Sequence, residues 1–546
     1  MHPSSLTETT FQKHDGSARI LICDALSPAA LEVFEKRGFN PEVETGMDEA
    51  RLLERVDEVD ALVIRSATKI TRAVIERAKK LRVIGRAGVG VDNVDCDAAT
   101  ENGVVVMNTP TGNTTTTGEL AIALLCSLAR HIPRADRGTR SGNWSKKALT
   151  GTELTGKTLG IVGFGRIGRV VAERALGLKL KVLATDPFLQ KEEAEALIPG
   201  IEFVTLDEML PRTDFVTLHM PLTDSTRNLF SRERLATMKH GVRIINAARG
   251  GLIDEAALAE ALDSGQVAGA ALDVLAQEPP SDDHPLLGRD DVILTPHLGA
   301  SSHEAQHNVA IDVATQICDF IELGVANNAV NVPAVSAHSL RAIAPYVRLA
   351  EKMGSFLAQR STEPLRKLEI TISGELAKED TRHLPLAVLV GLLRTSTRGV
   401  NMVNAPILAK EHGLRVLEAT DEDAGNFQSL IKVRGSSRAG EESRLVVGTV
   451  FGRRPRFVRV DDLHLDFEPA GPVLITEHED QPGVLGQLGT LLGEHAVNIR
   501  RLELGAPRKG DNVAIGILCL DEDPDDDVLA AVRAMPAVRG VQLVRL

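Results

Sequence analysis

Short apolar runs alternate with helical segments in the N-terminal part of the chain, and this alternation limits the possible folds more than any other feature of the sequence. The apolar runs at residues 20–23, 61–64, 81–84 and 104–107 are separated by segments with the composition of helices. Strands that alternate with helices form a parallel sheet with helices on both faces. We therefore expect an α/β fold here, with a doubly wound parallel sheet.

A second series of apolar runs follows a long apolar helix predicted near Glu119 to Arg130. The runs predicted as strands of this series are 158–162, 181–185, 215–218, 243–245, 269–272 and 292–295. They are enough for a second doubly wound sheet. After a predicted helix at 302–323, the asparagine-rich segment from Asn327 to Pro333 ends the α/β pattern.

The remaining sequence predicts two further domains. A chain of 546 residues is too long for one core, because single cores stop growing near about 250 to 300 residues. From Pro333 to about Pro469 a helix at 343–360 is mixed with β-rich stretches such as 368–373, which predicts an α+β domain. From Ala470 onward the predicted order is β-α-β-β-α-β, a ferredoxin-like arrangement. Its predicted elements are strand 473–476, helix 484–494, strands 498–504 and 513–520, helix 525–535 and strand 541–545.

Composition and charge disfavour several classes of protein. The formal net charge of −13 argues against nucleic acid as a partner, because phosphate backbones are bound by clustered Lys and Arg. No run of about 18 apolar residues occurs, so no membrane-spanning helix is predicted. The five cysteines form no Cys-x-x-Cys pair, which is typical of a reducing compartment. Residues 1–17 have the features of neither a secretory signal nor a transit peptide, so we expect a mobile tail and a cytoplasmic protein.

A glycine motif directly after a predicted strand indicates a dinucleotide site. Gly163, Gly165 and Gly168 have the spacing Gly-x-Gly-x-x-Gly and open a helix predicted from Arg166. The free N–H groups and the positive dipole end of a helix N-terminus attract a pyrophosphate. Asp186 closes the next predicted strand, where a carboxylate holds the ribose hydroxyls and repels a 2′-phosphate. The motif therefore predicts NAD rather than NADP.

A second glycine run, from Gly85 to Gly90, lacks this spacing and precedes Asp92 rather than an apolar helix. Its small residues let backbone N–H groups approach an anionic ligand. We expect it to be a loop on the substrate side of the site, and not a second cofactor motif.

Arg249, Glu278 and His297 each follow a predicted strand of the second series. Oxidation of a 2-hydroxy acid needs a base for the hydroxyl proton, a cation for the carboxylate and a hydride acceptor. His297 is the candidate base, and Glu278 would orient its ring and stabilise its protonated form. Arg249 can hold a carboxylate through two parallel hydrogen bonds. Each residue alone is uninformative, since a single His or Arg at such a position is usually ordinary surface chemistry.

The segments around Arg249, Glu278 and His297, together with the glycine motif, resemble the D-isomer-specific 2-hydroxyacid dehydrogenase family over nearly all of the chain after residue 17. The resemblance implies that these three residues are catalytic and that no metal takes part. The cofactor-binding residues that it implies are Gly163, Gly165, Arg166, Ile167, Gly168, Asp186, Asp273, Gly299 and Ala300. The substrate-binding residues that it implies are Arg65, Ser66, Gly88, Gly90 and Asn113.

The same resemblance implies how the chain is divided into domains. Two doubly wound parallel-sheet domains, one flavodoxin-like and one of the Rossmann type, would be followed by an α+β intervening domain and a C-terminal ferredoxin-like ACT domain. The implied boundaries are a tail at 1–17, a discontinuous substrate-binding domain at 18–110 with 297–330, an NAD-binding domain at 111–296, the intervening domain at 331–468 and the ACT domain at 469–546.

The length and the two last domains resemble the long members of the family, which oxidise 3-phosphoglycerate to 3-phosphohydroxypyruvate with NAD at the start of L-serine biosynthesis. The turn Asp480-x-Pro482-Gly483 resembles that of an ACT domain. By resemblance, His478, Asp480 and Asn498 would hold L-serine as an effector between subunits of a homo-oligomer, a dimer or a tetramer. An ACT module without a ligand is the alternative.

Two other functions stay open at this point. Another D-2-hydroxyacid dehydrogenase, acting on hydroxypyruvate, glyoxylate or 2-oxoglutarate, would have the same three polar residues, although such enzymes resemble only the part of the chain before about residue 330. An NAD-sensing scaffold protein would use the fold to recruit partners. Only an activity measurement distinguishes between these hypotheses.

Overall fold

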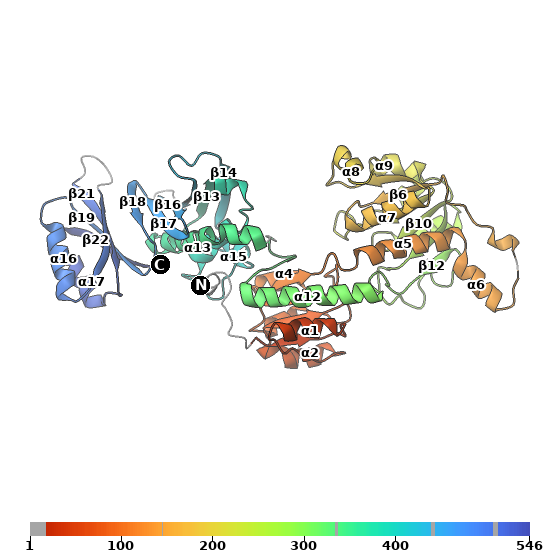
Figure 1. The fold of residues 1–546 in the computed structure, drawn as a ribbon, viewed down its shortest axis with the longest axis horizontal. Helices are drawn as coiled ribbons and strands as arrows, with labels where there is room; N and C mark the ends of the chain where they lie inside the picture. Colours follow the sequence, from red (N-terminus) through yellow and green to blue (C-terminus); the bar gives the residue numbers. More distant parts are fainter. Residues whose placement is uncertain (1–17, 145, 334–336, 438–442, 506–511) are drawn as a thin grey trace.

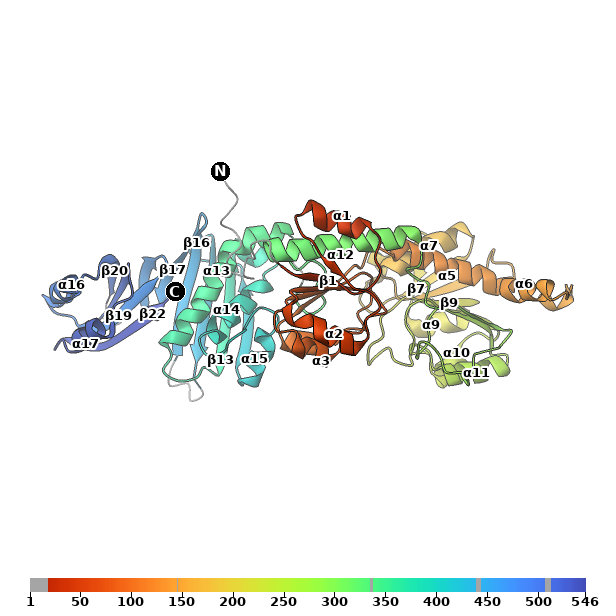
Figure 2. The same cartoon turned by 90° about the horizontal axis from the view of Figure 1, so that it is seen from below.

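The computed structural model describes residues 18–144, 146–333, 337–437, 443–505 and 512–546. These residues form four β-sheets in an elongated molecule (Figures 1 and 2). The first sheet lies between the second sheet, which forms one end, and the two C-terminal sheets, which extend to the other end. The expected mobile tail at residues 1–17 lies outside the described residues.

The first sheet has five parallel strands in the order β2-β1-β3-β4-β5, the order of flavodoxin-like folds. Its strands are β1 (Ile20–Ile22), β2 (Glu42–Val43), β3 (Ala61–Ile64), β4 (Val83–Arg86) and β5 (Val105–Asn108). Its helices are α1 (Ala29–Lys36), α2 (Glu49–Arg55), α3 (Arg72–Arg77), α4 (Cys96–Glu101) and a 3-10 turn at Val56–Glu58. The doubly wound sheet is therefore confirmed.

Two strands of this sheet lie later than predicted. β4 ends at Arg86 and β5 at Asn108, where the apolar pattern ends at 84 and 107. The polar residues belong to the strands because Arg86 pairs with Asn108 in the parallel ladder. Backbone pairing, rather than side-chain polarity, decides where the strands end. This places the Arg86 side chain at the carboxyl end of the sheet.

The second sheet has seven parallel strands in the order β12-β11-β10-β9-β6-β7-β8, which extends the strand order of a Rossmann fold by one strand. Its strands are β6 (Thr158–Val162), β7 (Lys181–Thr185), β8 (Ile201–Phe203), β9 (Phe215–Leu218), β10 (Val242–Asn246), β11 (Val267–Leu272) and β12 (Val292–Leu294). Its helices are α5 (Thr114–Ala129), α6 (Ile132–Arg140), α7 (Arg166–Gly177), α8 (Lys191–Leu197), α9 (Leu206–Met209), α10 (Arg232–Thr237) and α11 (Glu255–Asp263), with 3-10 turns at Lys147–Leu149 and Leu210–Arg212.

The sequence did not predict β8, and it placed the start of α5 too late. β8 is an edge strand of three residues, too short to show an apolar pattern. α5 begins at Thr114 because its first turn packs against the rest of the protein: Thr117 Oγ1 donates to the carbonyl of Gly299 at 2.8 Å. Tertiary contact here overrides the weak helix propensity of four threonines in succession.

Helix α12 (His303–Leu323) returns the chain from the second sheet to the first. Its buried face, which includes Val313 and Ile317, belongs to the core of the first sheet. A Cβ on Gly85 of β4 would lie 2.7 Å from Val313 Cγ2, so this glycine allows the helix to approach the strand closely. Arg37, directly after α1, pairs with Glu322 at the far end of α12. In Figure 1, α12 is the long green helix beside α1.

The third sheet has six strands in the order β14-β13-β15-β16-β17-β18, with a parallel β13–β14 pair and antiparallel pairs elsewhere. Its strands are β13 (Lys367–Gly374), β14 (Arg415–Asp421), β15 (Ser429–Ser436), β16 (Ser443–Phe451), β17 (Arg454–Val460) and β18 (Leu463–Phe467). Its helices are α13 (Ala337–Arg360), α14 (His383–Leu393), α15 (Ala405–Glu411) and a 3-10 turn at Glu375–Lys378. The predicted α+β character of this part of the chain is confirmed.

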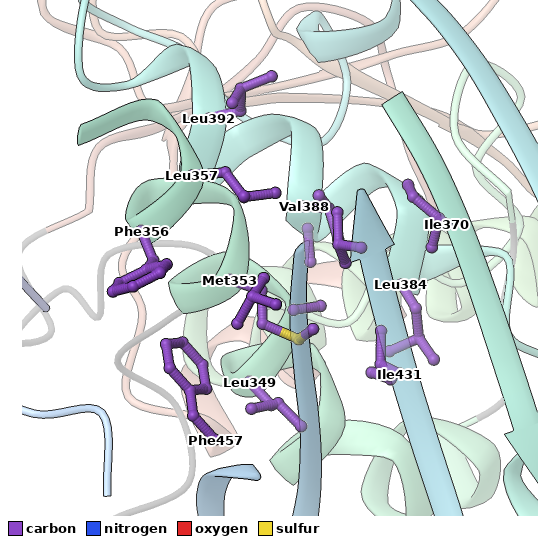
Figure 3. Close-up of a cluster of buried hydrophobic side chains, with 14 of the residues drawn as sticks. Leu349, Met353, Phe356, Leu357, Ile370, Leu384, Val388, Leu392, Ile431 and Phe457 are labelled. Atoms are coloured by element: carbon purple, nitrogen blue, oxygen red, sulfur yellow. The ribbon is translucent and has the colours of Figure 1, made fainter. Parts of the chain in front are cut away.

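Helices α13 and α14 pack together over one face of the third sheet (Figure 3). They approach closely because Gly354 and Gly391 lie at their crossing, where added Cβ atoms would lie 2.0 and 1.8 Å from backbone oxygens of the other helix. The ring of Phe457 is fully buried there, edge-on to Phe356 with centroids 5.3 Å apart. This cluster is the main core of the domain.

The fourth sheet has the order β20-β21-β19-β22, and the β-α-β-β-α-β arrangement is confirmed. Its elements are β19 (Pro472–Glu479), α16 (Val484–Glu494), β20 (Ile499–Gly505), β21 (Val513–Leu520), α17 (Asp526–Arg533) and β22 (Val538–Arg545). The face opposite its helices carries Val473 and Ile475 into the core that α13 also lines. The third and fourth sheets therefore share one continuous hydrophobic core.

The third sheet's domain also contacts the first. Asn401 Nδ2 donates to the carbonyl of Gly103 at 2.9 Å, and Val403 lies in the core that α12 covers. Among the described residues, no helix is long and apolar enough to span a bilayer.

Truncating Phe457 tests the core of the third domain. Phe457→Ala should destabilise it by about 3–5 kcal/mol, the usual cost of removing a buried ring and leaving a cavity. Scanning calorimetry should show a lower melting temperature, with faster amide exchange in α13 and β17. Phe451→Ala, at a ring that is 53% exposed on the neighbouring strand, is the matched control. Equal effects of the two variants would contradict this description of the core.

Candidate active site

A cavity of about 490 Å³ lies where the carboxyl ends of the first two sheets meet. Arg65 follows β3 and Gly90 follows β4, so the first sheet supplies one side. Arg249 follows β10, Glu278 follows β11 and His297 follows β12, so the second sheet supplies the other. Ligands of open α/β sheets bind at this end of the strands. The three polar residues singled out in the sequence therefore line one cavity.

His297 and Glu278 form a hydrogen-bonded pair. His297 Nδ1 lies 2.8 Å from Glu278 Oε2, and both side chains are partly exposed to the cavity. Burial works to raise the pKa of Glu278, but the hydrogen bond and charge of His297, with smaller help from Leu275 N–H and Arg249, hold it below its usual value. Glu278 is thus a carboxylate at neutral pH. It fixes the imidazole ring and leaves Nε2 available for proton exchange with a ligand.

A second histidine, His219, lines the same cavity but has different chemistry. Burial lowers its pKa to about 3, so its ring is neutral at physiological pH. Its Nε2 contacts Thr217 Oγ1 at 2.9 Å. A histidine that cannot take up a proton near neutral pH is a poor general base. This contrast favours His297 as the proton-exchanging group of the cavity.

Asp273 holds the loop that presents His297. Its Oδ1 accepts from Thr295 Oγ1 at 2.6 Å and from the Leu298 N–H at 2.7 Å, and its Oδ2 accepts from the Gly299 N–H at 2.9 Å. Burial raises the pKa of this carboxyl, against the hydrogen bonds that favour its charged form. The structure gives Asp273 a role in ordering this loop, which the sequence did not indicate.

Arg249 reaches the cavity beside the glycine run of the first sheet. Its Nε donates to Asp92 Oδ2 at 3.1 Å, and its Nη1 donates to its neighbour, the Ala248 carbonyl. A Cβ on Gly90 would lie 2.0 Å from Arg249 Nη2, so the guanidinium group can occupy this position only because residue 90 has no side chain. The sequence did not single out Asp92 as a partner of Arg249, because the two lie far apart along the chain.

The glycine motif has the geometry of a phosphate cradle. Gly165 precedes α7 without a side-chain cap, and a Cβ there would meet nothing within 4 Å, which leaves open space beside the helix N-terminus. A Cβ on Gly163 or on Gly168 would lie 2.5 or 2.2 Å from a backbone oxygen, so both must be glycine. Asp186 stands at the end of β7, where its Oδ2 accepts from the Phe164 N–H at 2.9 Å. These features fit a dinucleotide that has no 2′-phosphate.

The other residues assigned to cofactor and substrate lie around the same cavity. The lining includes Arg65, Ser66, Gly90, Asn113, Ile167, Gly299 and Ala300. The loop carrying Arg65 is ordered by Asp24, which accepts from the Arg65 N–H, and by Asn93, which donates to the Arg65 carbonyl. Arg166 is exposed at the start of α7, and Gly88 is buried against Arg86 and is not among the residues that line the cavity.

The residues assigned to an effector lie in the fourth sheet's domain. His478 is 2% exposed on β19, which continues three residues beyond its predicted end because this segment pairs with both β21 and β22. Asp480 and Asn498 are exposed, and Asn498 Nδ2 donates to Asp521 Oδ2 at 2.5 Å. Within one chain, His478 is thus buried while its two assigned partners face solvent. Among the described residues no group of His, Cys, Asp or Glu has the arrangement of a metal site.

Three family profiles match the chain in succession. The profile of the D-isomer specific 2-hydroxyacid dehydrogenase NAD-binding domain matches residues 122–299, that of the D-3-phosphoglycerate dehydrogenase intervening domain matches residues 342–461, and that of the ACT domain matches residues 473–537. Curated proteins similar to the chain include the D-3-phosphoglycerate dehydrogenase of Archaeoglobus fulgidus, 41% identical over 97% of this chain and all of that protein. That of Bacillus subtilis is 40% identical over 97% of this chain and 99% of its own.

Solved structures resemble the part of the chain that holds the cavity. The TT0316 protein of Thermus thermophilus is 37% identical, with a TM-score of 0.52, and covers 57% of this chain and 99% of its own. A glyoxylate reductase from a Paecilomyes species is 32% identical, with a TM-score of 0.53, and covers 57% of this chain and 98% of its own.

Replacing Asp273 tests its role in ordering the loop. Asp273→Ala removes three hydrogen bonds to a charged acceptor, each worth about 1.5–3 kcal/mol, and should accelerate amide exchange at Leu298 and Gly299 by at least tenfold. Asp224→Ala, at an exposed aspartate, is the control and should change neither amide. Wild-type protection of both amides in Asp273→Ala would show that the loop is ordered by other contacts.

Proposed function

Because the chain belongs to the D-isomer-specific 2-hydroxyacid dehydrogenase family, and within it to the D-3-phosphoglycerate dehydrogenases, we propose that it oxidises 3-phosphoglycerate to 3-phosphohydroxypyruvate. It is an NAD-dependent oxidoreductase acting on a CH–OH group. The product is the 2-oxo acid from which L-serine is made, so the reaction is the first committed step of serine biosynthesis. The observation that carries the proposal is that the hydrogen-bonded His297–Glu278 pair and Arg249 line one cavity.

In this proposal His297 is the general base. Its Nε2 takes the proton of the substrate's 2-hydroxyl as C2 is oxidised, and the nearby Glu278 carboxylate stabilises the imidazolium that forms. In the reverse direction the same Nε2 returns the proton to the 2-oxo group. Arg249 holds the substrate carboxylate, which fixes C2 relative to the imidazole.

NAD, when bound, accepts the hydride from C2. The residues that would hold it are the glycine turn, Arg166 and Ile167 at the start of α7, Asp186 at the ribose, Asp273, and the loop from His297 to Ala300. Ser66, Asn113 and the glycine run would bind substrate, with Arg65 at the phosphate.

We also propose a cytoplasmic homo-oligomer, dimeric or tetrameric, that is regulated by L-serine at the ACT domain. The functional groups of serine are complementary to the assigned residues. The Asp480 carboxylate could bind the ammonium group of serine, and the Asn498 amide could donate to its carboxylate. Because His478 is buried within one chain, the site would be completed by a neighbouring subunit or by a movement of β19. The support for this is the ACT-domain match at residues 473–537.

Removing the proposed base should slow turnover strongly. With 3-phosphoglycerate and NAD, the wild-type protein should produce NADH, and His297→Ala should lower kcat by about 10²–10⁴-fold, the usual contribution of a general base. Glu278→Gln keeps the shape but removes the charge, so its kcat should fall by a smaller factor. His240→Ala, at an exposed histidine, is the control. Wild-type turnover by His297→Ala would refute the mechanism.

A substrate panel separates the related activities. Glyoxylate, hydroxypyruvate and 2-oxoglutarate should each give a lower kcat/KM with NADH than 3-phosphohydroxypyruvate gives. A preference for glyoxylate would make the protein a glyoxylate reductase, as one solved relative is named. A folded wild-type protein that binds NAD but turns over none of these acids would support an NAD-sensing scaffold.

Serine regulation has its own test. L-Serine should inhibit the wild-type protein, and Asn498→Ala should raise the half-inhibitory concentration at least tenfold because the amide is lost. Gln487→Ala, at an exposed residue of the same domain, should respond to serine as the wild type does. If serine neither binds by calorimetry nor slows the reaction, the ACT domain is structural here.

A further inference from the structure

Arg86 is a cation at the wall of the catalytic cavity that forms no close ion pair in the described part of the chain, although Asp92 and Asp24 attract it from farther away. It ends β4, and its side chain contributes to the cavity lining. Its Nε is buried and has no hydrogen-bond acceptor, and no ion pair with a described carboxylate includes this residue. Asp92, the carboxylate of the adjacent loop, pairs with Arg249 instead. A charged group left without a partner in a buried place is costly unless something compensates it.

Arg86 and Arg249 lie against the same short loop. A Cβ on Gly88 would lie 1.7 Å from Arg86 Nη1, and a Cβ on Gly90 would lie 2.0 Å from Arg249 Nη2. The two guanidinium groups therefore flank the loop Gly88-Val89-Gly90. Burial, followed by repulsion from Arg249, lowers the pKa of Arg86 to about 10, against weaker attraction from Asp92 and Asp24. The side chain stays charged at neutral pH, so the fold brings two like charges together beside the cavity.

A second buried arginine shows that burial alone does not indicate a ligand. Arg82, four residues earlier, also has buried nitrogens without hydrogen-bond acceptors, and burial lowers its pKa. Its guanidinium lies 5.5 Å from the centroid of the Phe320 ring, inside the core of the first sheet. The protein itself supplies a partner for that cation, through the ring face. Arg86 differs because it borders the catalytic cavity.

We propose that Arg86 is a substrate-binding residue that holds the carboxylate of the 2-hydroxy acid together with Arg249. An anion at the loop is attracted by both guanidinium groups and by backbone N–H groups between them. Arg65, on the loop after β3, would then bind the phosphate of the same substrate. The inference rests on the proposed function for the identity of that substrate. It explains why Gly88 must lack a side chain, since a Cβ would displace the Arg86 guanidinium.

Three variants and a matched control test this role. Arg86→Met should raise the KM for 3-phosphoglycerate at least tenfold, with the KM for NAD changed less than twofold, and Arg86→Lys should recover part of the loss because it restores the charge. Gly88→Ala keeps the arginine but displaces its guanidinium, so it should also raise this KM. Arg82→Met removes an arginine of the same strand region away from the cavity and should leave the KM unchanged. Thermal melts establish that each variant is folded.

Binding of tartronate, a 2-hydroxy dicarboxylate without a phosphate, gives a readout independent of turnover. In calorimetry on the NAD-bound protein, Arg86→Met should weaken tartronate binding at least tenfold. Tartronate affinity within twofold of the wild type would overturn the carboxylate assignment, and a raised KM for 3-phosphoglycerate in the same variant would then place Arg86 at the phosphate. If the wild type fails to oxidise 3-phosphoglycerate, the proposed function fails, while loss of tartronate binding in Arg86→Met still supports this role.

Discussion

The burial of helix α12 against the first sheet is the constraint on which the rest of the catalytic structure depends. The chain leaves the first sheet after β5, builds the whole second sheet and then returns through α12. Because the returning helix packs its apolar face into the first core, the two sheets are connected twice. Their carboxyl ends therefore face each other, and residues from β3, β4, β10, β11 and β12 reach one cavity. Without the second connection, His297 and Arg65 would have no fixed relation.

The net charge of the cavity depends on which of its charged side chains form ion pairs with one another and which do not. Glu278 is paired with His297, and Asp92 with Arg249, so each carboxylate is committed to one neighbour. Arg86 forms no close ion pair among the described residues. The substrate side therefore carries an excess of positive charge beside a neutral His219. A small polyanion with a hydroxyl group is complementary to such a site, which agrees with the family assignment.

The sequence predicted those features that local pattern determines. The spacing of the glycine motif and Asp186 is set by the close approach of the backbone in this turn. The order of strand, glycine turn and helix was therefore predicted correctly from the sequence. Strand ends at Arg86 and Asn108 were not predictable, because they depend on pairing between strands rather than on polarity. Asp273 and Thr117 were likewise not visible as loop-ordering residues, since both act on residues far along the chain. The chemistry of His297 and Glu278 suggested that the two residues interact. Only the structure shows the hydrogen bond between them.

The core shared by the third and fourth sheets has a mechanical consequence. Close-packed interiors resist sliding, since small displacements lose many contacts at once. We therefore expect the ACT domain and the intervening domain to move together as a single rigid arm. At its inner end the arm meets the first sheet through Asn401, Gly103 and Val403. This contact lies next to β5, whose neighbouring strand β4 ends at Arg86.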